Sequence, residues 1–289
     1  MRLQARRHSI EFPTSPIIMG IVNLSRDSFS GDGCADLNAA FEKAQTLMSD
    51  GAVMIDVGAE SARTNRAAIG EQEEIDLLTA FAQRWKGAKG SGEIDLRPIL
   101  SINTWRPAVA RTVLREGGDL LNDIGGLATD ENARACAETS AALVIMHTVG
   151  EPKMPHTHVQ YEDVMGRLDQ FFTGKIAMAE SAGLPRDAIV IDPGIDFAKQ
   201  RDDNLRIYRE LSRLKRFDRP ILLPVSRKTV VGDVLGVPPL ERDAGTVACS
   251  VAGVLRGANI LRVHNVRAVA QAVQVLHAVD APGDWQRMS

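Results

Sequence analysis

The sequence predicts an α/β fold, a single (β/α)8 barrel of parallel strands, from three observations. Short β-branched runs alternate strictly with amphipathic helical segments along the chain, which is typical of parallel βαβ units. Eight such units in about 250 residues fit a closed TIM barrel. Nearly every predicted strand also ends in a polar residue, at the edge where barrels place their chemistry. A doubly wound open sheet is the competing arrangement.

The strands are expected where apolar, β-branched residues run without interruption, as in strands buried on both faces. In chain order they are 17–23, 53–59, 99–103, 120–123, 143–147, 189–193, 221–226 and 260–264. Residues 1–15 form an N-terminal extension, expected to add a small strand or hairpin that closes the bottom of the barrel. No linker or repeat interrupts the chain, so one domain is expected over 1–289.

The helical segments repeat apolar residues at helical spacing and carry end signals. The segment 37–51 ends at Gly51, a residue that suits a helix C-terminus, and Pro107 suits the first position of the helix in 107–118. A further helix is expected over 73–85. The segment 266–279, VRAVAQAVQVLHAV, has more apolar positions than one core face requires. This excess suggests a second buried face, such as a subunit interface.

Composition excludes several classes of protein. The 289 residues are 44% hydrophobic and 25% charged, with a net charge of -3, which is ordinary for a soluble globular chain. The low charge argues against a broad nucleic-acid or membrane surface. The chain lacks both a signal-peptide pattern and an apolar run of about 20 residues. Three cysteines without paired spacing indicate reduced thiols, and we expect a cytoplasmic protein.

Polar side chains gather at the predicted strand ends. In strand order they are Asn23, Asp56, Glu60, Asn103, Asn122, Asp123, His147, Asp192, Ser226, Arg227, Lys228, Arg262 and His264. One polar strand end can simply cap the next helix. A ring that mixes carboxylates, amides and cations instead needs partners, which a polar ligand can supply. We therefore expect a small-molecule site at this rim.

The residue types in the ring indicate the ligand. Four cationic side chains can form a local anion site suited to phosphate or diphosphate: Arg63, Lys228, Arg262 and His264. The amide oxygen of Asn23 suits Mg²⁺ carried by such a phosphate. Asp192 and Asn122 can read the N–H groups of a planar heterocycle, on which Arg262 can stack. The loops 24–36 and 59–70, which include Asp27, Phe29, Asp32 and Arg63, look like lids.

Along residues 16–280, the chain resembles the pterin-binding (β/α)8 family of dihydropteroate synthases. The motifs that carry the resemblance are MGIVNLSRDSFSGDG (19–33), IDVGAESAR (55–63), SINTW (101–105), LNDIGG (121–126), VIMHTVGEP (144–152), IDPGIDFAK (191–199), PVSRKT (224–229) and ILRVHNV (260–266). Their order and spacing make the match specific. The resemblance implies a transferase that joins 6-hydroxymethyl-7,8-dihydropterin diphosphate to p-aminobenzoate and releases pyrophosphate. It also implies a homodimer.

The resemblance assigns roles by position. The pterin contacts are Asn122, Met146, Asp192 and Lys228, with Arg262 over the ring. The residues implied for the diphosphate and its Mg²⁺ are Asn23, Arg63, Arg262 and His264. Those implied near the p-aminobenzoate are Phe29, Phe197 and Ser226. The residues implied to act on the reacting pterin are Asn103, Asp192, Lys228 and Arg262.

The sequence departs from the family at several places. Asn103 replaces the aspartate of the usual Ser-Ile-Asp-Thr motif, and the sixth-strand loop replaces two glycines by Asp196 and Ala198. Both lid motifs are altered as well. An amide at position 103 keeps the shape but offers only a dipole to the positive charge that develops on the pterin. Pterin binding should survive while pyrophosphate loss slows by about 10²–10³, unless Asp56 or Asp123 supplies the charge.

Other interpretations stay open. Asp56 and Asp123 are expected to orient neighbours rather than to touch the substrate, and His147 is expected to be structural. Asp196 can be read as a solvated loop charge. Asp192, which precedes Pro193, can also be read as a turn residue. The departures favour a pterin-binding paralogue without synthase activity as an alternative function. Another pterin-dependent transferase on the same barrel, such as a methyl transferase, is the third possibility.

Overall fold

The computed structural model describes residues 1–12, 16–24, 33–34, 36–60, 68–92, 94, 98–154 and 158–280. Its centre is a set of parallel strands that lie where the apolar runs predict them. These are β3 (Ile17–Asn23), β4 (Met54–Gly58), β5 (Ile99–Asn103), β6 (Leu120–Asp123), β7 (Ala142–Met146), β8 (Ile189–Asp192), β9 (Leu222–Pro224) and β10 (Ile260–Val263).

The strands close into a barrel rather than an open sheet. Their order is β8-β7-β6-β5-β4-β3-β10-β9, and every pairing is parallel. A parallel bridge between Ile191 and Ile221 joins the two ends of this series, and the Ile191 N–H donates to the Pro220 carbonyl at 3.0 Å. The predicted (β/α)8 barrel is confirmed.

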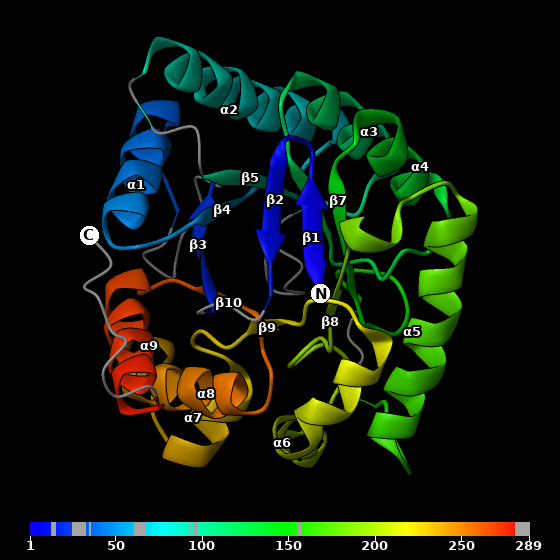
Figure 1. Cartoon of the computed structure of the whole chain (residues 1–289), viewed down its shortest axis with the longest axis vertical. Coiled ribbons are helices and arrows are strands. Elements are labelled where there is room, and N and C mark those ends of the chain that lie inside the picture. Colours follow the sequence, from blue (N-terminus) through cyan, green and yellow to red (C-terminus); the bar gives the residue numbers. More distant parts are fainter. Residues whose placement is uncertain are drawn as a thin grey trace.

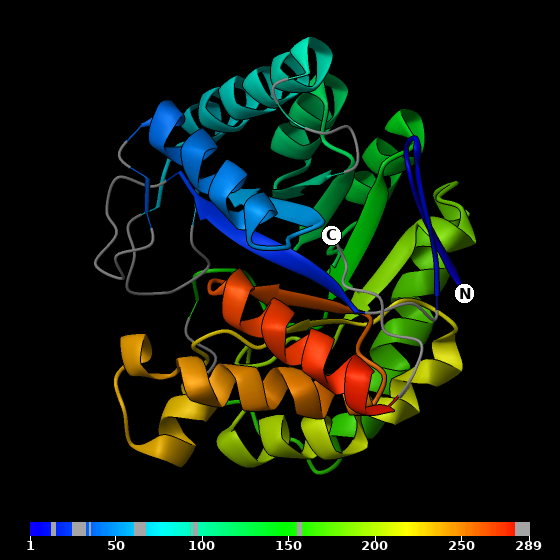
Figure 2. The same ribbon diagram turned by 60° about the vertical axis from the view of Figure 1, so that its left-hand side comes forward.

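Helices form a ring around the barrel (Figure 1). They are α1 (Leu37–Ser49), α2 (Glu71–Ser91), α3 (Pro107–Glu116), α4 (Glu131–Thr139), α5 (Val164–Ser181), α6 (Arg201–Glu210), α7 (Thr229–Leu235), α8 (Asp243–Leu255) and α9 (Val266–Asp280). Short 3-10 turns occur at Arg186–Ala188, Leu211–Phe217 and Pro239–Glu241. Figure 2 shows β3 running between α1 and α9, with which it is in contact.

Local signals explain where these helices begin and how they pack. The Asp36 carboxylate caps α1 by accepting from the Ala39 N–H at 2.9 Å, and Pro107 begins α3 as expected. Phe41 on α1 meets Phe81 and Trp85 on α2, with ring centroids 6.1–6.3 Å apart. All three are buried, and each side chain of this size stabilises the fold by about 1.5–3 kcal/mol.

The N-terminal residues form the expected hairpin, β1 (Arg2–Ala5) paired antiparallel with β2 (His8–Glu11). Arg6 ties it to the barrel: its N–H donates to Ser140 O, and its Nε to Gly118 O, both at 2.7 Å. Gly118 and Ser140 lie just before β6 and β7, so the hairpin covers the end of the barrel where strands begin (Figure 1). The opposite end is left for the site.

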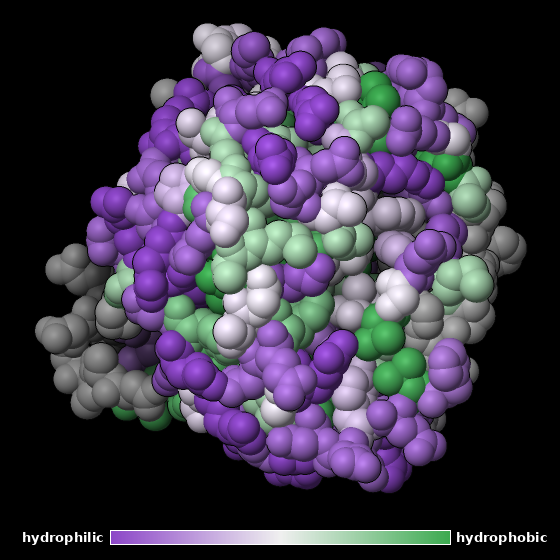
Figure 3. Space-filling view, turned by 90° about the vertical axis from the view of Figure 1, so that its right-hand side faces the viewer, coloured by the Kyte–Doolittle hydropathy of each residue, from purple (hydrophilic) through white to green (hydrophobic). Residues whose placement is uncertain are grey.

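The outer surface is mixed in character. On the face drawn in Figure 3, hydrophilic residues predominate and hydrophobic ones are scattered among them. None of the helices in the described residues combines the length and apolar character that crossing a membrane requires.

Candidate functional site

Most of the predicted site residues come together at the C-terminal ends of the strands. Asn23, Asn103, Asn122, Asp192 and Arg262 end or nearly end their strands, as expected. Met146 pairs in register with Asp192 and is buried, so it can form an apolar wall beside that carboxylate. Two predicted contacts, Phe29 and Arg63, lie outside the described residues, as do Asp27 and Asp32.

Asp56 is the centre of the polar network in the barrel. Its Oδ1 accepts from Ser101 Oγ at 2.5 Å, and its Oδ2 accepts from Asn103 Nδ2 and Asn122 Nδ2, both at 3.1 Å. The Nε of Arg262 donates to the same Oδ2 at 2.7 Å, which makes an ion pair across β3. Asp56 is fully buried, and both of its oxygens are used by the protein.

Asn103 and Asn122 each keep an unused acceptor. Their Oδ1 atoms are buried and have no hydrogen-bond partner within the described residues. An unpaired buried acceptor costs about 1–3 kcal/mol, so a ligand that donates N–H groups here recovers that free energy. The backbone makes room for Asn103, because a Cβ added at its neighbour Gly58 would lie 3.3 Å from the Asn103 Cβ.

Asp192 lies four strands away from Asp56 in the barrel. Its Oδ1 accepts from the Gly194 N–H at 2.7 Å, the geometry of a turn. Burial raises the pKa of Asp192 to about 6, although Gly194 and the charges of Lys228, Lys199 and Arg262 oppose the rise. A buried carboxylate with positive charges around it can accept the donor edge of a heterocycle.

Lys199 is a buried cation that sequence reasoning left without a role. Its Nζ contacts three acceptors: His147 Nδ1 at 2.8 Å, Phe197 O at 3.0 Å and His147 O at 3.4 Å. Burial lowers the pKa of Lys199 to about 7 and that of His147 to about 2. His147 is therefore neutral, and its structural role stays a prediction. The signal available in the sequence was a lysine in a strand-end loop.

The loop after β8 is tied to the loop after β9. Lys228 Nζ donates to Ile195 O at 2.8 Å and lies 4.9 Å from the centre of the Phe197 ring. The Asp196 carboxylate accepts from the N–H groups of Thr229 and Val230 at the start of α7. The interpretation of Asp196 as a solvated loop charge was wrong, because its carboxylate caps this helix.

The two departures from glycine in this loop keep a left-handed backbone. Asp196 has φ +67° and Ala198 has φ +50°. Aspartate tolerates this conformation, and its hydrogen bonds offset the cost. For Ala198 the steric cost is about 1–2 kcal/mol. The loop thus retains a backbone shape that suits glycine.

His264 and Ser226 form a pair at the ends of β10 and β9. The His264 N–H donates to Ser226 Oγ at 3.1 Å, and His264 Nδ1 lies 2.7 Å from the same oxygen. Next to them, Arg227 Nε donates to Asp243 at 3.0 Å, so Arg227 is held by α8. Lys228 follows β9, and Arg262 and His264 lie at the end of β10, so these three predicted anion-binding residues come from adjacent strands.

Asp123 faces away from this network. Its carboxylate accepts from Asn132 Nδ2 at 2.9 Å and from the Gly125 N–H at 2.8 Å. Burial raises its pKa to about 6. Asp123 therefore holds α4 and the loop after β6. Of the two carboxylates that could compensate for Asn103, Asp56 is the one in contact with it.

A second charged cluster at the rim was missed by sequence reasoning. Arg106 Nη1 lies 2.6 Å from Glu60 Oε2 and also contacts Glu74, while Lys153 Nζ lies 3.0 Å from Glu60 Oε1. Burial raises the pKa of Glu74, although Arg106 opposes the rise. Since β4 ends at Gly58, this cluster anchors the chain that follows that strand.

Comparisons with known proteins agree on one family. Residues 19–264 match the model of the family described as "Pterin binding enzyme". Dihydropteroate synthase of Escherichia coli (strain K12) is 34% identical over 283 residues, 96% of each chain. The structure of the Yersinia pestis dihydropteroate synthase with a sulfonamide drug complex has a TM-score of 0.88 at 34% identity, covering 97% of this chain and 99% of that one. The Xanthomonas albilineans dihydropteroate synthase with 4-aminobenzoic acid has a TM-score of 0.85 at 31% identity, covering 97% and 98%.

Proposed function

This chain belongs to the family of pterin binding enzymes, and from that membership we propose that it is a transferase of the dihydropteroate synthase type in folate biosynthesis. Its reaction joins 6-hydroxymethyl-7,8-dihydropterin diphosphate to p-aminobenzoate and releases pyrophosphate. The observation that carries the proposal is the likeness to dihydropteroate synthases over nearly the whole of both chains, combined with a rim that carries Asn122, Asp192, Lys228 and Arg262 at or just after the strand ends.

The pterin is held from two sides of the barrel. Asp192 accepts the N–H groups of one edge, and the unpaired oxygens of Asn103 and Asn122 accept donors elsewhere on the ring. Arg262 can cover the ring face with its planar guanidinium while its Nε remains on Asp56. Met146 supplies an apolar contact.

Positively charged side chains stabilise the charge that develops on the leaving diphosphate. Arg63, Arg262 and His264 neutralise the diphosphate, so the carbon–oxygen bond to the pterin methylene can break with the electron pair leaving on pyrophosphate. The arylamine nitrogen then attacks the electron-poor methylene and loses a proton. Phe29, Phe197 and Ser226 border the p-aminobenzoate. Phe197 is held by Lys228 over its ring, and Ser226 by His264.

Mg²⁺ fits the site as an ion that arrives with the diphosphate. Within the described residues, no group of three or more His, Cys, Asp and Glu side chains could hold a metal. Asn23 at the end of β3 would add one amide oxygen to a shell of phosphate oxygens and waters, the kind of coordination that Mg²⁺ prefers. Chelation of Mg²⁺ should then slow turnover, and a rate insensitive to EDTA would contradict this role.

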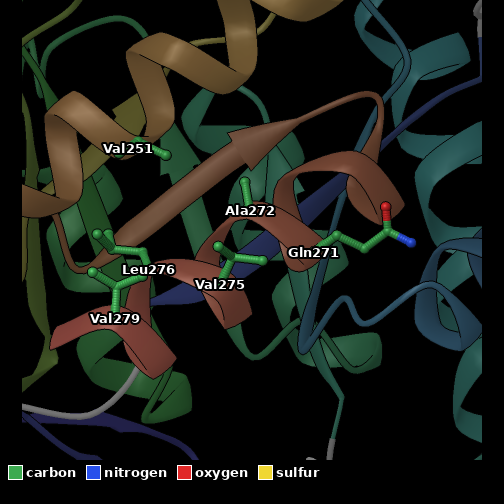
Figure 4. A pocket seen from close by; sticks show the side chains of 6 residues that line it. All are labelled: Val251, Gln271, Ala272, Val275, Leu276 and Val279. Atoms are coloured by element: carbon green, nitrogen blue, oxygen red, sulfur yellow. The ribbon is translucent and has the colours of Figure 1, made fainter. Parts of the chain in front are cut away.

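We also propose a homodimer that covers the outer face of α8 and α9. Val266, Val269 and Val273 turn inward, whereas Val275 and Val279 are 63% and 70% exposed. An apolar hollow is lined by Val251, Gln271, Ala272, Val275, Leu276 and Val279. Figure 4 shows Val251 on α8 facing Leu276 and Val279 on α9, with the Gln271 amide directed away.

Light scattering tests the dimer at micromolar concentration. The native chain should have twice the monomer mass, and Val275→Glu should shift it towards the monomer because it buries a charge at the interface. Gln274→Glu on the same helix is a matched control for the added charge. A monomeric native chain would contradict the proposal. A cytoplasmic location agrees with the reduced thiols that the sequence indicates.

The alternative, a pterin binder without synthase activity, is favoured by one observation, the amide at Asn103. A pyrophosphate-release assay with the pterin diphosphate, with and without p-aminobenzoate, separates the two. A synthase gives multiple turnovers that depend on the arylamine. Tight pterin binding without any release would favour the alternative.

A further inference from the structure

The network around Asp56 determines which atoms of two asparagines can meet a ligand. An ionised carboxylate only accepts hydrogen bonds, so the atoms of Asn103 and Asn122 that face it must be amide nitrogens. Both nitrogens lie 3.1 Å from Asp56 Oδ2. The amide oxygens are thereby directed elsewhere, and both are buried without a partner in the described part of the chain.

The orientation of these amides is locked. Asp56 forms an ion pair with Arg262 at 2.7 Å, through the same oxygen, Oδ2, that accepts from both amides. Turning either amide would place its oxygen against the carboxylate, where lone pairs face one another, and would lose a charge-assisted hydrogen bond. An aspartate at position 103 has no N–H to donate to Asp56. The arrangement therefore depends on the amide of Asn103.

We propose that Asp56 is a positioning residue that sets the hydrogen-bonding polarity of the pterin pocket. Through Asn103 and Asn122 it presents two acceptors, which favour a ring with N–H groups at this edge over one with bare nitrogens. A 7,8-dihydropterin has one more ring N–H than the aromatic pterin, whose corresponding nitrogen carries a lone pair. Asp56 thus selects the reduced ring. This inference rests on the proposed function, since it takes a pterin as the ligand.

Calorimetry with two ligands that lack phosphate tests the proposal without requiring turnover. The native protein should bind 6-hydroxymethyl-7,8-dihydropterin at least about tenfold more tightly than 6-hydroxymethylpterin, because the bare nitrogen leaves an acceptor unpaired. In Asp56→Asn the central group can donate as well as accept, so the neighbouring amides can turn. The affinity ratio should fall to within about threefold.

Two further variants test the proposal even if Asp56→Asn does not fold. Asn103→Leu removes one acceptor but retains the ion pair of Asp56 with Arg262, and its ratio should fall as well. Ser101→Ala removes a donor to the other oxygen of Asp56, leaves both asparagines in place and should keep the native ratio.

The outcomes separate this inference from the proposed function. A native ratio near one, or an undiminished ratio in a folded Asp56→Asn, would overturn the role of Asp56. If Asp56→Asn does not fold, an undiminished ratio in Asn103→Leu overturns it instead. A native protein that binds neither pterin would overturn the proposed function itself, and the inference with it.

Discussion

Two buried carboxylates at opposite sides of the barrel, Asp56 on β4 and Asp192 on β8, differ in how the protein treats them. Asp56 accepts hydrogen bonds from four side chains, one of them a guanidinium. Asp192 accepts one from the Gly194 backbone, and burial raises its pKa to about 6. A carboxylate whose oxygens are filled by the protein organises its neighbours. One that is buried with few donors is suited to a ligand.

The largest expected effect is on stability, from Asp56→Ala. Removing the carboxylate leaves the buried end of Arg262 and three further donors unpaired, which should lower the free energy of unfolding by about 3–5 kcal/mol. Chemical denaturation at neutral pH measures this change. A loss below about 1 kcal/mol would mean that Asp56 does not organise the network.

Asp192→Asn, in contrast, should weaken pterin binding and leave the stability of the fold intact. Replacing two acceptors by one acceptor and a misplaced donor should cost about 2–4 kcal/mol of pterin affinity. Its folding should be unharmed at pH 7, because ionising Asp192 costs stability as the pH rises from 3.8 through about 6. Calorimetry and denaturation on the same sample test both. Unchanged pterin binding by a folded variant would remove Asp192 from the site.

The smallest expected effect is the pH dependence of pterin binding, which follows from the raised pKa of Asp192. The ionised fraction of Asp192 rises about tenfold between pH 5 and pH 7, so the pterin should bind about tenfold more tightly at pH 7. Titrations at half-unit intervals should place the midpoint near pH 6. In Asp192→Asn this pH dependence should disappear. A midpoint that persists in the variant would belong to another group, such as Lys199, whose pKa burial lowers to about 7.

The barrel was predictable from sequence because apolar runs such as Ile99–Asn103 are buried on both faces, and closure brings their polar ends together. The partners of those polar ends were not predictable. That Asn103 donates to Asp56, or that Lys199 contacts His147, depends on which side chains a closed barrel brings within hydrogen-bond distance. Asp196 was misread because its partners in α7 lie more than 30 residues along the chain.

Asn103, which stands where the family has an aspartate, is in direct contact with Asp56. The structure places Asp56 against it and turns Asp123 away, so Asp56 is the carboxylate able to supply the charge that Asn103 lacks. A second carboxylate at position 103 would stand about 3 Å from Asp56, where it would replace a hydrogen-bond donor by a group of like charge.

The most direct test of whether Asp56 supplies this charge is single-turnover release of pyrophosphate. It compares the native protein with Asn103→Asp, both saturated with the pterin diphosphate and Mg²⁺. With the negative charge assigned to Asp56, the two rates are expected to agree within about tenfold, and both proteins should bind the pterin. A native protein that binds the substrate yet releases pyrophosphate about 10²–10³-fold more slowly than Asn103→Asp would contradict that assignment.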